Sequence, residues 1–319
     1  MKSTFFFMPS DRLHQDTSSR QASTLHEQDL PTTRISRPMK SATMTLLLLL
    51  LLTPTDTAED GAILIFILAG QSNAAGYGVK WEAARALHGP ALPRTILHYC
   101  QGSPSRPRCS SGWVPLSGTG NRLPPSPGSE LAIGAAVHNY SQLPVGIIKV
   151  TFNGTGLAQS NKPDWNTGSA ELFQILLERI RLAVQELPSH LGARLAGFFW
   201  LQGESDALEG PDQPNQANGY ERNLNDLIRQ VRLELRQPEL PVVIARISPP
   251  ESTRNGRLFS YRHTVREAQS RLARGNRKIA QVNTDDLPRQ EDDLHFTEKG
   301  QSILGRRFVE AWLKLTSSH

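Results

Sequence analysis

The chain has 319 residues, of which 38% are hydrophobic and 20% are charged, and its formal net charge at pH 7 is +5. After a poorly patterned N-terminal segment, roughly 260 residues remain, which suits one α/β domain. Aromatic residues are not interleaved with the basic ones, and the arginines between positions 222 and 236 are spaced as on an exposed helix face. The composition therefore argues against nucleic-acid binding, and we expect no nucleic acid among the partners.

Residues 1–60 differ from the rest of the chain. Residues 1–43 are polar and lack periodicity, which is typical of disorder. The leucine run 46–52 is too short to span a bilayer, but it is similar to the apolar core of a secretory signal, with Lys40 before it and Ala58 as a cleavage residue. A low-complexity leader without a targeting role is the alternative. We expect a disordered leader, no stable membrane span, and a protein that is secreted or resides in the secretory pathway.

Two further features bear on export. Asn139 and Asn153 each begin an N-glycosylation sequon. Cys100 and Cys109 are the two cysteines of the chain, and no Cys or His pattern around them suits zinc. Their close spacing allows a local disulfide in an exported chain, and two free thiols remain the alternative. We expect no metal and no cofactor.

The hydrophobic pattern after residue 61 alternates between strands and helices. A long irregular region over residues 77–129, rich in Pro, Gly and Ser, interrupts it. Strands are predicted at 62–69, 145–152, 195–201, 241–247 and 278–283, and helices at 130–140, 169–186, 220–236, 259–274 and 297–315. Such alternation predicts an α/β fold, in which a central parallel sheet is covered by helices on both faces. We expect one domain over residues 61–319.

The first strand leads into a turn of small and polar residues. Gly70 ends the apolar run, and Gln71, Ser72 and Asn73 follow it. Open α/β sheets carry their sites at the carboxyl ends of the strands, so Ser72 lies where a nucleophile could lie. The stretch is not a nucleophile elbow, because Ala74 stands where that motif has its second glycine, and it lacks the Gly-Lys pair of a phosphate loop. A plain strand-to-loop turn is the alternative.

Two more polar clusters come after predicted strands. Residues 202–206 read Gln-Gly-Glu-Ser-Asp, and residues 291–295 read Glu-Asp-Asp-Leu-His. A serine hydroxyl needs a base to take its proton, and histidine is the usual one. His295 is the candidate base, and Asp292, three residues earlier, can orient its ring from a tight turn. Each cluster alone also fits a polar loop or a helix cap, but the three together predict a serine-based active site.

In this order and context, residues 70–73, residues 202–206 and the Asp-x-x-His of residues 292–295 resemble the ordered blocks of the SGNH-hydrolase superfamily. The resemblance is to its sialate O-acetylesterase-like branch, which includes the acetylxylan esterases of carbohydrate esterase family 6. It covers about residues 62–316. It implies a flavodoxin-like three-layer α/β/α sandwich and a reaction without a metal.

The resemblance also implies a role for each residue. Ser72 would be the nucleophile, His295 the general base and Asp292 its orienting acid. Family members build the oxyanion hole from the nucleophile's own backbone N–H, a glycine and an amide side chain. Ser72, Gly128 and Gln202 are the candidates for these three donors. Such donors meet charge that appears only in the transition state, and losing one costs about 10²–10³ in rate.

Asn73 and Glu204 are candidates for supporting roles. Glu204 could instead be the acid of the triad, but we favour Asp292, because a carboxylate close in sequence to the base is easily held against it. The chain departs from the pattern of the family at three places. Ala74 stands where Met is frequent, Ser129 replaces the proline of Gly-Pro-Glu, and Leu201 stands where His often precedes Gln.

The leading hypothesis is a serine esterase that removes O-acetyl groups from a carbohydrate through an acetyl-enzyme. The sequence leaves the sugar open among xylan, pectin and sialic acid. A non-catalytic carbohydrate-binding module on the same fold is the first alternative, and an esterase that acts on a non-sugar ester such as a lipid is the second. The expected partner is an acetylated carbohydrate, and its recognition would fall to the long loops at 77–129 and 207–219.

Overall fold

A computed structural model describes residues 62–88, 94–118, 120, 122–160, 162–168 and 171–317. The predicted leader over residues 1–60, with its leucine run, lies outside these residues. Within the described ranges, no helix combines the length and the apolar character that crossing a membrane requires.

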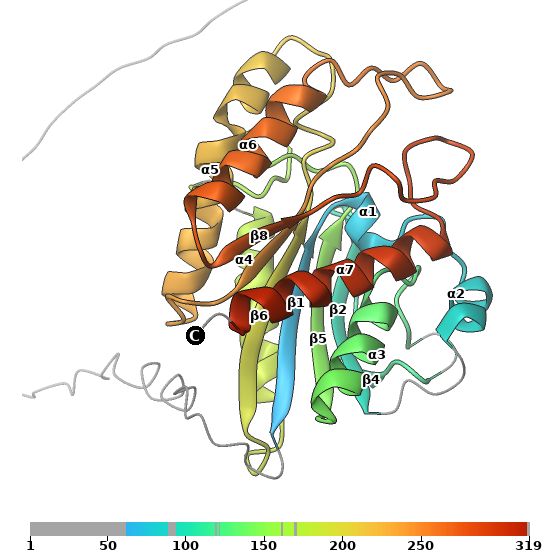
Figure 1. Cartoon of the computed structure of the whole chain (residues 1–319), viewed down its shortest axis with the longest axis vertical. Helices are drawn as coiled ribbons and strands as arrows, with labels where there is room; N and C mark the ends of the chain where they lie inside the picture. The colour runs from blue at the N-terminus through green and yellow to red at the C-terminus, as the bar shows by residue number, and fades with distance from the viewer. Residues whose placement is uncertain are drawn as a thin grey trace, which may run out of the picture. The chain divides into compact units, whose positions relative to one another are not determined.

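One mostly parallel sheet forms the centre of the domain (Figure 1). Its strands lie in the order β3-β2-β5-β1-β6-β7-β8, and β4 pairs with β2. Only β3 and β4 run antiparallel to their neighbour β2. The strands are β1 (Ile63–Gly70), β2 (Thr95–Ser103), β3 (Arg106–Cys109), β4 (Val114–Pro115), β5 (Val145–Phe152), β6 (Ala193–Leu201), β7 (Val242–Ala245) and β8 (Ile279–Val282).

Helices cover both faces of this sheet, so the expected three-layer α/β/α sandwich is confirmed. Side chains of α4, α5 and α6 pack in the core on one face, and side chains of α1, α2, α3 and α7 pack in the core on the other. The helices are α1 (Ser72–Ala75), α2 (Trp81–His88), α3 (Glu130–Ser141), α4 (Glu171–Gln185), α5 (Gln213–Glu234), α6 (Arg262–Gly275) and α7 (Glu298–Thr316).

The position of β1 at the centre of the sheet explains its apolar sequence. All eight of its residues are buried. Ile65 and Ile67 point into one core, and Leu64, Phe66 and Leu68 point into the other. A strand covered on both faces needs apolar side chains at every position, which is why it does not alternate with polar residues.

The strand order places a switch point at the end of β1. The strands β5-β1-β6-β7-β8 have the flavodoxin order: β5 lies on one side of β1, and the later strands β6, β7 and β8 lie on its other side. The strand β2 extends the sheet beyond β5. Since the connections leave β1 in opposite directions, the carboxyl end of β1 lies at an opening between loops, and Ser72 comes directly after it.

The region over residues 77–129 is the main difference from the predicted elements. It is not a long irregular loop, because it contains α2 and the strands β2 to β4. The hydrophobic pattern did not predict the strand β2, because its residues His98 and Gln101 are polar although they are buried. Cys100 of β2 lies directly opposite Cys109 of β3, and a disulfide joins them.

The short helix α1 lies where the sequence predicted a turn. The remaining elements differ from the prediction only at their ends, apart from α5. That helix begins at Gln213 and not at residue 220. Its first two turns are polar because several of their side chains face a cavity and not the core. Pro214 lies in the first turn, where a helix tolerates proline.

A buried ion pair lies beneath α1. Lys149 of β5 and Glu130 of α3 are both fully buried, and their Nζ and Oε1 atoms are 2.8 Å apart. Lys149 Nζ also donates to the carbonyl oxygens of Ala75, at 3.0 Å, and Ser126, at 3.3 Å. Burial lowers the pKa of Lys149, although Glu130 opposes this shift. The pair therefore links the sheet and α3 to the last residue of the short helix that begins with Ser72.

We expect Lys149→Met to destabilise the protein strongly, because it leaves the Glu130 carboxylate buried without its counter-charge. Breaking a buried pair in this way costs about 3–5 kcal/mol. Chemical denaturation would measure the loss. The double variant Lys149→Met/Glu130→Leu should recover much of it, since no charge is then left unpaired. A single variant as stable as the parent would contradict this account.

Candidate active site

A strained turn places Ser72 at the end of β1. Gly70 has φ of 144°, and a Cβ built there would lie 1.9 Å from the carbonyl oxygen of Leu201. Only glycine fits, because β1 and β6 approach so closely at this point. The Gln71 N–H then donates to the same carbonyl at 3.0 Å, and Ser72 begins α1. The sheet edge thus fixes the backbone that carries the hydroxyl.

The loop between β8 and α7 brings His295 and Asp292 to Ser72. His295 Nε2 lies 3.0 Å from Ser72 Oγ, and His295 Nδ1 lies 2.5 Å from Asp292 Oδ2. Asp292 Oδ1 accepts the N–H groups of Leu294, at 3.0 Å, and His295, at 2.9 Å. Ser72 lies far from Asp292 and His295 in the sequence, yet the three side chains form one chain of hydrogen bonds.

The surroundings keep Asp292 in its charged form. Partial burial alone would raise the pKa of this carboxyl, but the hydrogen bonds from the His295 N–H, the His295 ring and the Leu294 N–H outweigh that effect. The pKa of Asp292 consequently lies below its usual value. An ionised carboxylate on Nδ1 holds the ring with Nε2 free to accept a proton, which is what a general base requires.

Asn73 holds the histidine loop from below. Its Nδ2 donates to the Leu294 carbonyl at 3.2 Å, and its Oδ1 accepts the Phe296 N–H at 3.0 Å. These two backbone groups flank His295 in the sequence. Asn73 is 2% exposed, so these bonds are shielded from water. The residue after the serine therefore sets the position of the histidine.

Glu204 lies behind Asn73 and does not contact the histidine ring through a hydrogen bond. Its Oε1 accepts from Asn73 Nδ2 at 2.8 Å. Burial raises the pKa of Glu204, and the hydrogen bond from Asn73 only partly offsets this. Of the two candidate acids, the structure thus places Asp292 on the ring and Glu204 on the side chain that positions the loop.

The structure does not bring Gly128 and Gln202 to the site as donors. The Gly128 N–H donates to Glu130 Oε1 at 2.9 Å. Gln202 is fully buried, and its Nε2 lies 2.6 Å from Asp206 Oδ2 and 3.0 Å from the Thr155 carbonyl. Neither residue lines the cavity at Ser72. In the structure these N–H groups already serve other acceptors, which argues against both assignments.

Asp206 ties two loops together below the site. Its carboxylate accepts the backbone N–H groups of Leu157, at 3.0 Å, and Ala158, at 3.2 Å, besides the Gln202 amide. These residues lie after β5, whereas Asp206 lies after β6. Complete burial raises the pKa of Asp206 to about 6, although the hydrogen bonds counteract the shift.

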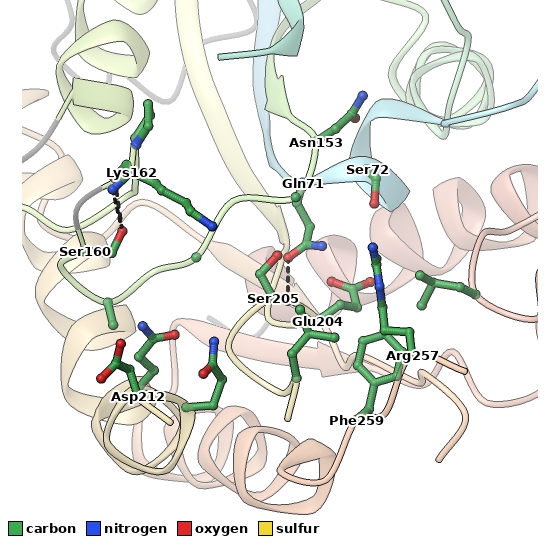
Figure 2. A pocket seen from close by; sticks show the side chains of 18 of the residues that line it. Gln71, Ser72, Asn153, Ser160, Lys162, Glu204, Ser205, Asp212, Arg257 and Phe259 are labelled. Carbon is green, nitrogen blue, oxygen red and sulfur yellow. Dashed lines mark hydrogen bonds between the residues drawn. The ribbon is translucent and has the colours of Figure 1, made fainter. Parts of the chain in front are cut away.

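A large cavity opens beside Ser72 and His295 (Figure 2). Its volume is about 1240 Å³, and polar side chains predominate in its lining. The loops after β5 and β6, the start of α5 and the loop before α6 form its walls. Examples of the lining residues are Gln71, Asn153, Lys162, Asp212 and Arg257. The ring of Tyr77 stands at its rim, 4.6 Å from the ring of His295.

Sequence reasoning missed the cavity residues Gln71 and Asn153 as site residues. Gln71 belongs to the same motif as Ser72, and Asn153 comes directly after a predicted strand. Both could have been predicted as site residues, because they follow strands at the carboxyl edge of the sheet. Among the described residues, no group of three or more His, Cys, Asp or Glu side chains is arranged to hold a metal ion.

An open α/β sheet with a serine after its first strand and an Asp-x-x-His before its last helix is the arrangement of an SGNH-type ester hydrolase. The model of the family "Carbohydrate esterase, sialic acid-specific acetylesterase" matches residues 62–314. The chain therefore belongs to this family, whose members are carboxylic ester hydrolases.

Individual relatives agree with this assignment. A probable carbohydrate esterase of Arabidopsis thaliana is 28% identical over 263 residues, which are 78% of this chain and 90% of the relative. A solved Arabidopsis thaliana structure is 26% identical and has a TM-score of 0.54, over 78% of this chain and 97% of that one.

Two more distant structures show the same fold. NanS is 18% identical with a TM-score of 0.55, over 81% of this chain and 99% of its own. A carbohydrate acetylesterase of Xanthomonas citri is 18% identical with a TM-score of 0.56, over 81% of this chain and 57% of its own.

The raised pKa of Asp206 predicts a pH-dependent loss of stability. Between its ordinary pKa of 3.8 and about 6, the folded state binds more protons than the unfolded state, so the free energy of unfolding falls as pH rises. The shift corresponds to about 3 kcal/mol. We expect Asp206→Asn to gain stability relative to the parent over this pH range. Denaturation at pH 4, 5, 6 and 7 would measure it.

The control is Asp226→Asn, which makes the same change at a carboxylate that is 39% exposed on α5. Its stability is measured at the same four pH values, so that the effect of the substitution itself can be subtracted. If Asp206→Asn also runs parallel to the parent, the buried carboxylate does not titrate as inferred.

Proposed function

We propose that this protein is a serine esterase that removes O-acetyl groups from a carbohydrate. The observation that carries the proposal is the chain of hydrogen bonds from Asp292 through His295 to Ser72 at the wall of a polar cavity. Membership of a carbohydrate esterase family supports it. The names of the carbohydrate acetylesterases that share the fold agree with the same reaction.

In the first step, Ser72 Oγ adds to the acetyl carbonyl carbon while its proton passes to His295 Nε2. The carbonyl π electrons move onto oxygen and form a tetrahedral oxyanion. Asp292 stabilises the imidazolium that results. The intermediate then collapses, the bond to the sugar oxygen breaks, and His295 returns the proton to that oxygen. An acetyl-enzyme remains on Ser72.

In the second step, water takes the place of the serine hydroxyl. His295 removes a proton from the water as its oxygen adds to the acetyl carbon. Collapse of this second intermediate breaks the bond to Ser72 Oγ, which recovers its proton from His295. Acetic acid leaves and releases its remaining proton to water as it becomes acetate, and the enzyme is restored. The Ser72 backbone N–H, at the start of α1, is one donor to the oxyanion in both steps.

The cavity supports a sugar as the alcohol part of the ester. An acetyl group offers little surface for recognition, whereas the cavity of about 1240 Å³ is lined largely by amide, hydroxyl and charged side chains. Such groups suit the hydroxyls of a carbohydrate. A lipid ester would need a long apolar wall, and the lining does not favour one. Xylan, pectin and sialic acid are all acetylated carbohydrates within this proposal.

We expect the parent to hydrolyse a small acetyl ester and Ser72→Ala to lose at least about 10⁴-fold in kcat/KM. The measurement is acetate release from p-nitrophenyl acetate and then from acetylated xylan, pectin and sialic acid. A folded parent without activity on any of these esters would favour a non-catalytic binding module instead.

The two carboxylates near His295 provide the matched comparison. Asp292→Asn should lower kcat by about 10⁴-fold, because the asparagine no longer holds the required tautomer. Glu204→Gln keeps an oxygen for Asn73 and should cost far less. The reverse order of effects would make Glu204 the acid of the triad.

We propose export for this chain, since a disulfide joins Cys100 and Cys109 and disulfides persist in oxidising compartments. The Asn139 side chain, which begins a sequon, is exposed at the end of α3. We expect the protein from a secreting host to bind a thiol-blocking reagent only after reduction, as mass spectrometry would show. Two thiols blocked without reduction would argue against export.

A further inference from the structure

Tyr77 is an exposed aromatic residue beside the candidate active site. Its relative exposure is 50%, and among the residues that the structure describes it joins neither of the two core clusters. It lines the cavity, and its ring centroid lies 4.6 Å from that of His295, with 40° between the two planes. A single exposed apolar residue is common on protein surfaces. An exposed ring that packs against the imidazole, at the edge of a polar cavity, has a more specific location.

The backbone holds Tyr77 in place from two sides. Its N–H donates to the Ser72 carbonyl at 3.0 Å, and its carbonyl accepts Gln290 Nε2 at 2.7 Å. The Gln290 N–H in turn donates to the His295 carbonyl at 2.7 Å. The glycines on either side of Tyr77 have φ of 75° and 80°, a region that favours glycine. The turn is therefore tied both to the serine and to the histidine loop, and the ring has a fixed origin.

The proposed reaction places the sugar beside the same imidazole. His295 Nε2 returns a proton to the sugar oxygen that leaves, so this oxygen must come within about 3 Å of Nε2. On the other side of the imidazole, Asp292 occupies Nδ1 at 2.5 Å. The acetylated sugar therefore enters from the cavity, where Tyr77 is one of the lining residues.

A sugar ring needs two kinds of surface. Its hydroxyls point outward from its edge, whereas C–H groups cover its faces and gain from leaving water. The polar walls of the cavity, with Asp212 and Arg257 among them, suit the hydroxyls (Figure 2). An aromatic face suits the C–H groups, and Tyr77 presents an exposed one. Phe259 also lines the cavity, but it is 1% exposed and packs in the core.

We propose that the ring of Tyr77 is the contact that selects a sugar as the alcohol part of the ester. One face of the acetylated sugar packs against the Tyr77 ring while its hydroxyls bind the polar walls. His295 then returns its proton to a sugar oxygen that this contact holds in position. The contact is present before and during the chemical step, so it acts mainly on binding. This inference rests on the proposed esterase reaction.

The test compares a sugar ester with a ring-free ester, using the full chain. Tyr77→Leu keeps an apolar side chain but removes the flat ring, and Tyr77→Phe keeps the ring but removes the hydroxyl. The sugar ester is xylose tetraacetate, acetylated pectin or O-acetylated sialic acid, whichever the parent hydrolyses with the highest kcat/KM. The ring-free ester is ethyl acetate.

We expect Tyr77→Leu to lower kcat/KM on the sugar ester about 10- to 30-fold, mainly through a higher KM, because one face of the sugar then stays in water. Ethyl acetate has no ring to bind, so its kcat/KM should stay within about twofold of the parent. Tyr77→Phe should match the parent on both esters, since the ring face is kept. The melting temperatures should be similar, because Tyr77 adds little to either core.

The control is Tyr140→Leu. It makes the same change at a tyrosine of α3 that is 65% exposed and lies outside the cavity lining. This variant should hydrolyse both esters as the parent does.

Several outcomes would overturn the inference while the esterase reaction stands. If Tyr77→Leu hydrolyses the sugar ester like the parent, the ring does not contact the sugar. If it loses activity equally on both esters, the ring only supports His295. If Tyr77→Phe falls as far as Tyr77→Leu, the hydroxyl and not the ring face makes the contact.

Reaction of Ser72 with diethyl p-nitrophenyl phosphate, followed by mass spectrometry, tests the esterase proposal separately. A parent that is labelled at Ser72 but hydrolyses no sugar ester would overturn the inference alone. A parent that is neither labelled nor active on any of the esters would remove the proposed function and this inference with it.

Discussion

The side chain of Asn73 is the interaction on which the geometry of the site depends. Ser72 belongs to the end of β1, whereas His295 belongs to a loop more than two hundred residues later. Asn73 accepts from and donates to the backbone on either side of His295, so one amide fixes the distance between Ser72 and His295. Because each partner has a fixed donor or acceptor character, the amide has only one possible orientation.

Glu204 extends this constraint to the neighbouring strand. Its buried carboxylate accepts the second hydrogen of the Asn73 amide and so orients it from the loop after β6. A buried carboxylate is costly, as its raised pKa shows, and such a cost persists only where the group is needed. Lys149 and Glu130 fix the opposite end of α1 in a similar way. The short helix that begins with Ser72 is thus held by buried polar groups at both ends.

Local sequence patterns predicted the strands and residues whose placement depends on their immediate neighbours in the chain. The strand at residues 145–152 has its predicted bounds, because burial on both faces leaves an unbroken apolar run. Ser72, Asp292 and His295 were found because each comes after a strand, and parallel strands bring their carboxyl ends to one edge. Asp292 and His295 are also close enough in sequence for their contact to be local.

The predictions that the structure does not support share a different cause. The strand β2 was missed because its buried polar residues break the pattern that marks a strand. Gly128 and Gln202 were assigned by resemblance to the motifs of the family, but whether an N–H is available depends on which acceptor lies beside it in space. Glu130 and Asp206 occupy these positions, and no local pattern records that. The type of a residue therefore shows whether it can donate a hydrogen bond. The three-dimensional network decides whether its N–H group is free to do so.

In the proposed reaction, the same distinction separates catalysis from recognition. Ser72 and the loop of His295 are fixed by the sheet edge, through Gly70, Asn73 and the loop after β6. The far walls of the cavity come from the loop after β5, the start of α5 and the loop before α6, none of which contains Ser72, Asp292 or His295. If the proposed reaction holds, substitutions in those walls change which sugar binds without moving Ser72 or His295. Because an acetyl group is the same on every sugar, the proposed chemistry needs only the rigid edge, and the choice of substrate falls to the loops.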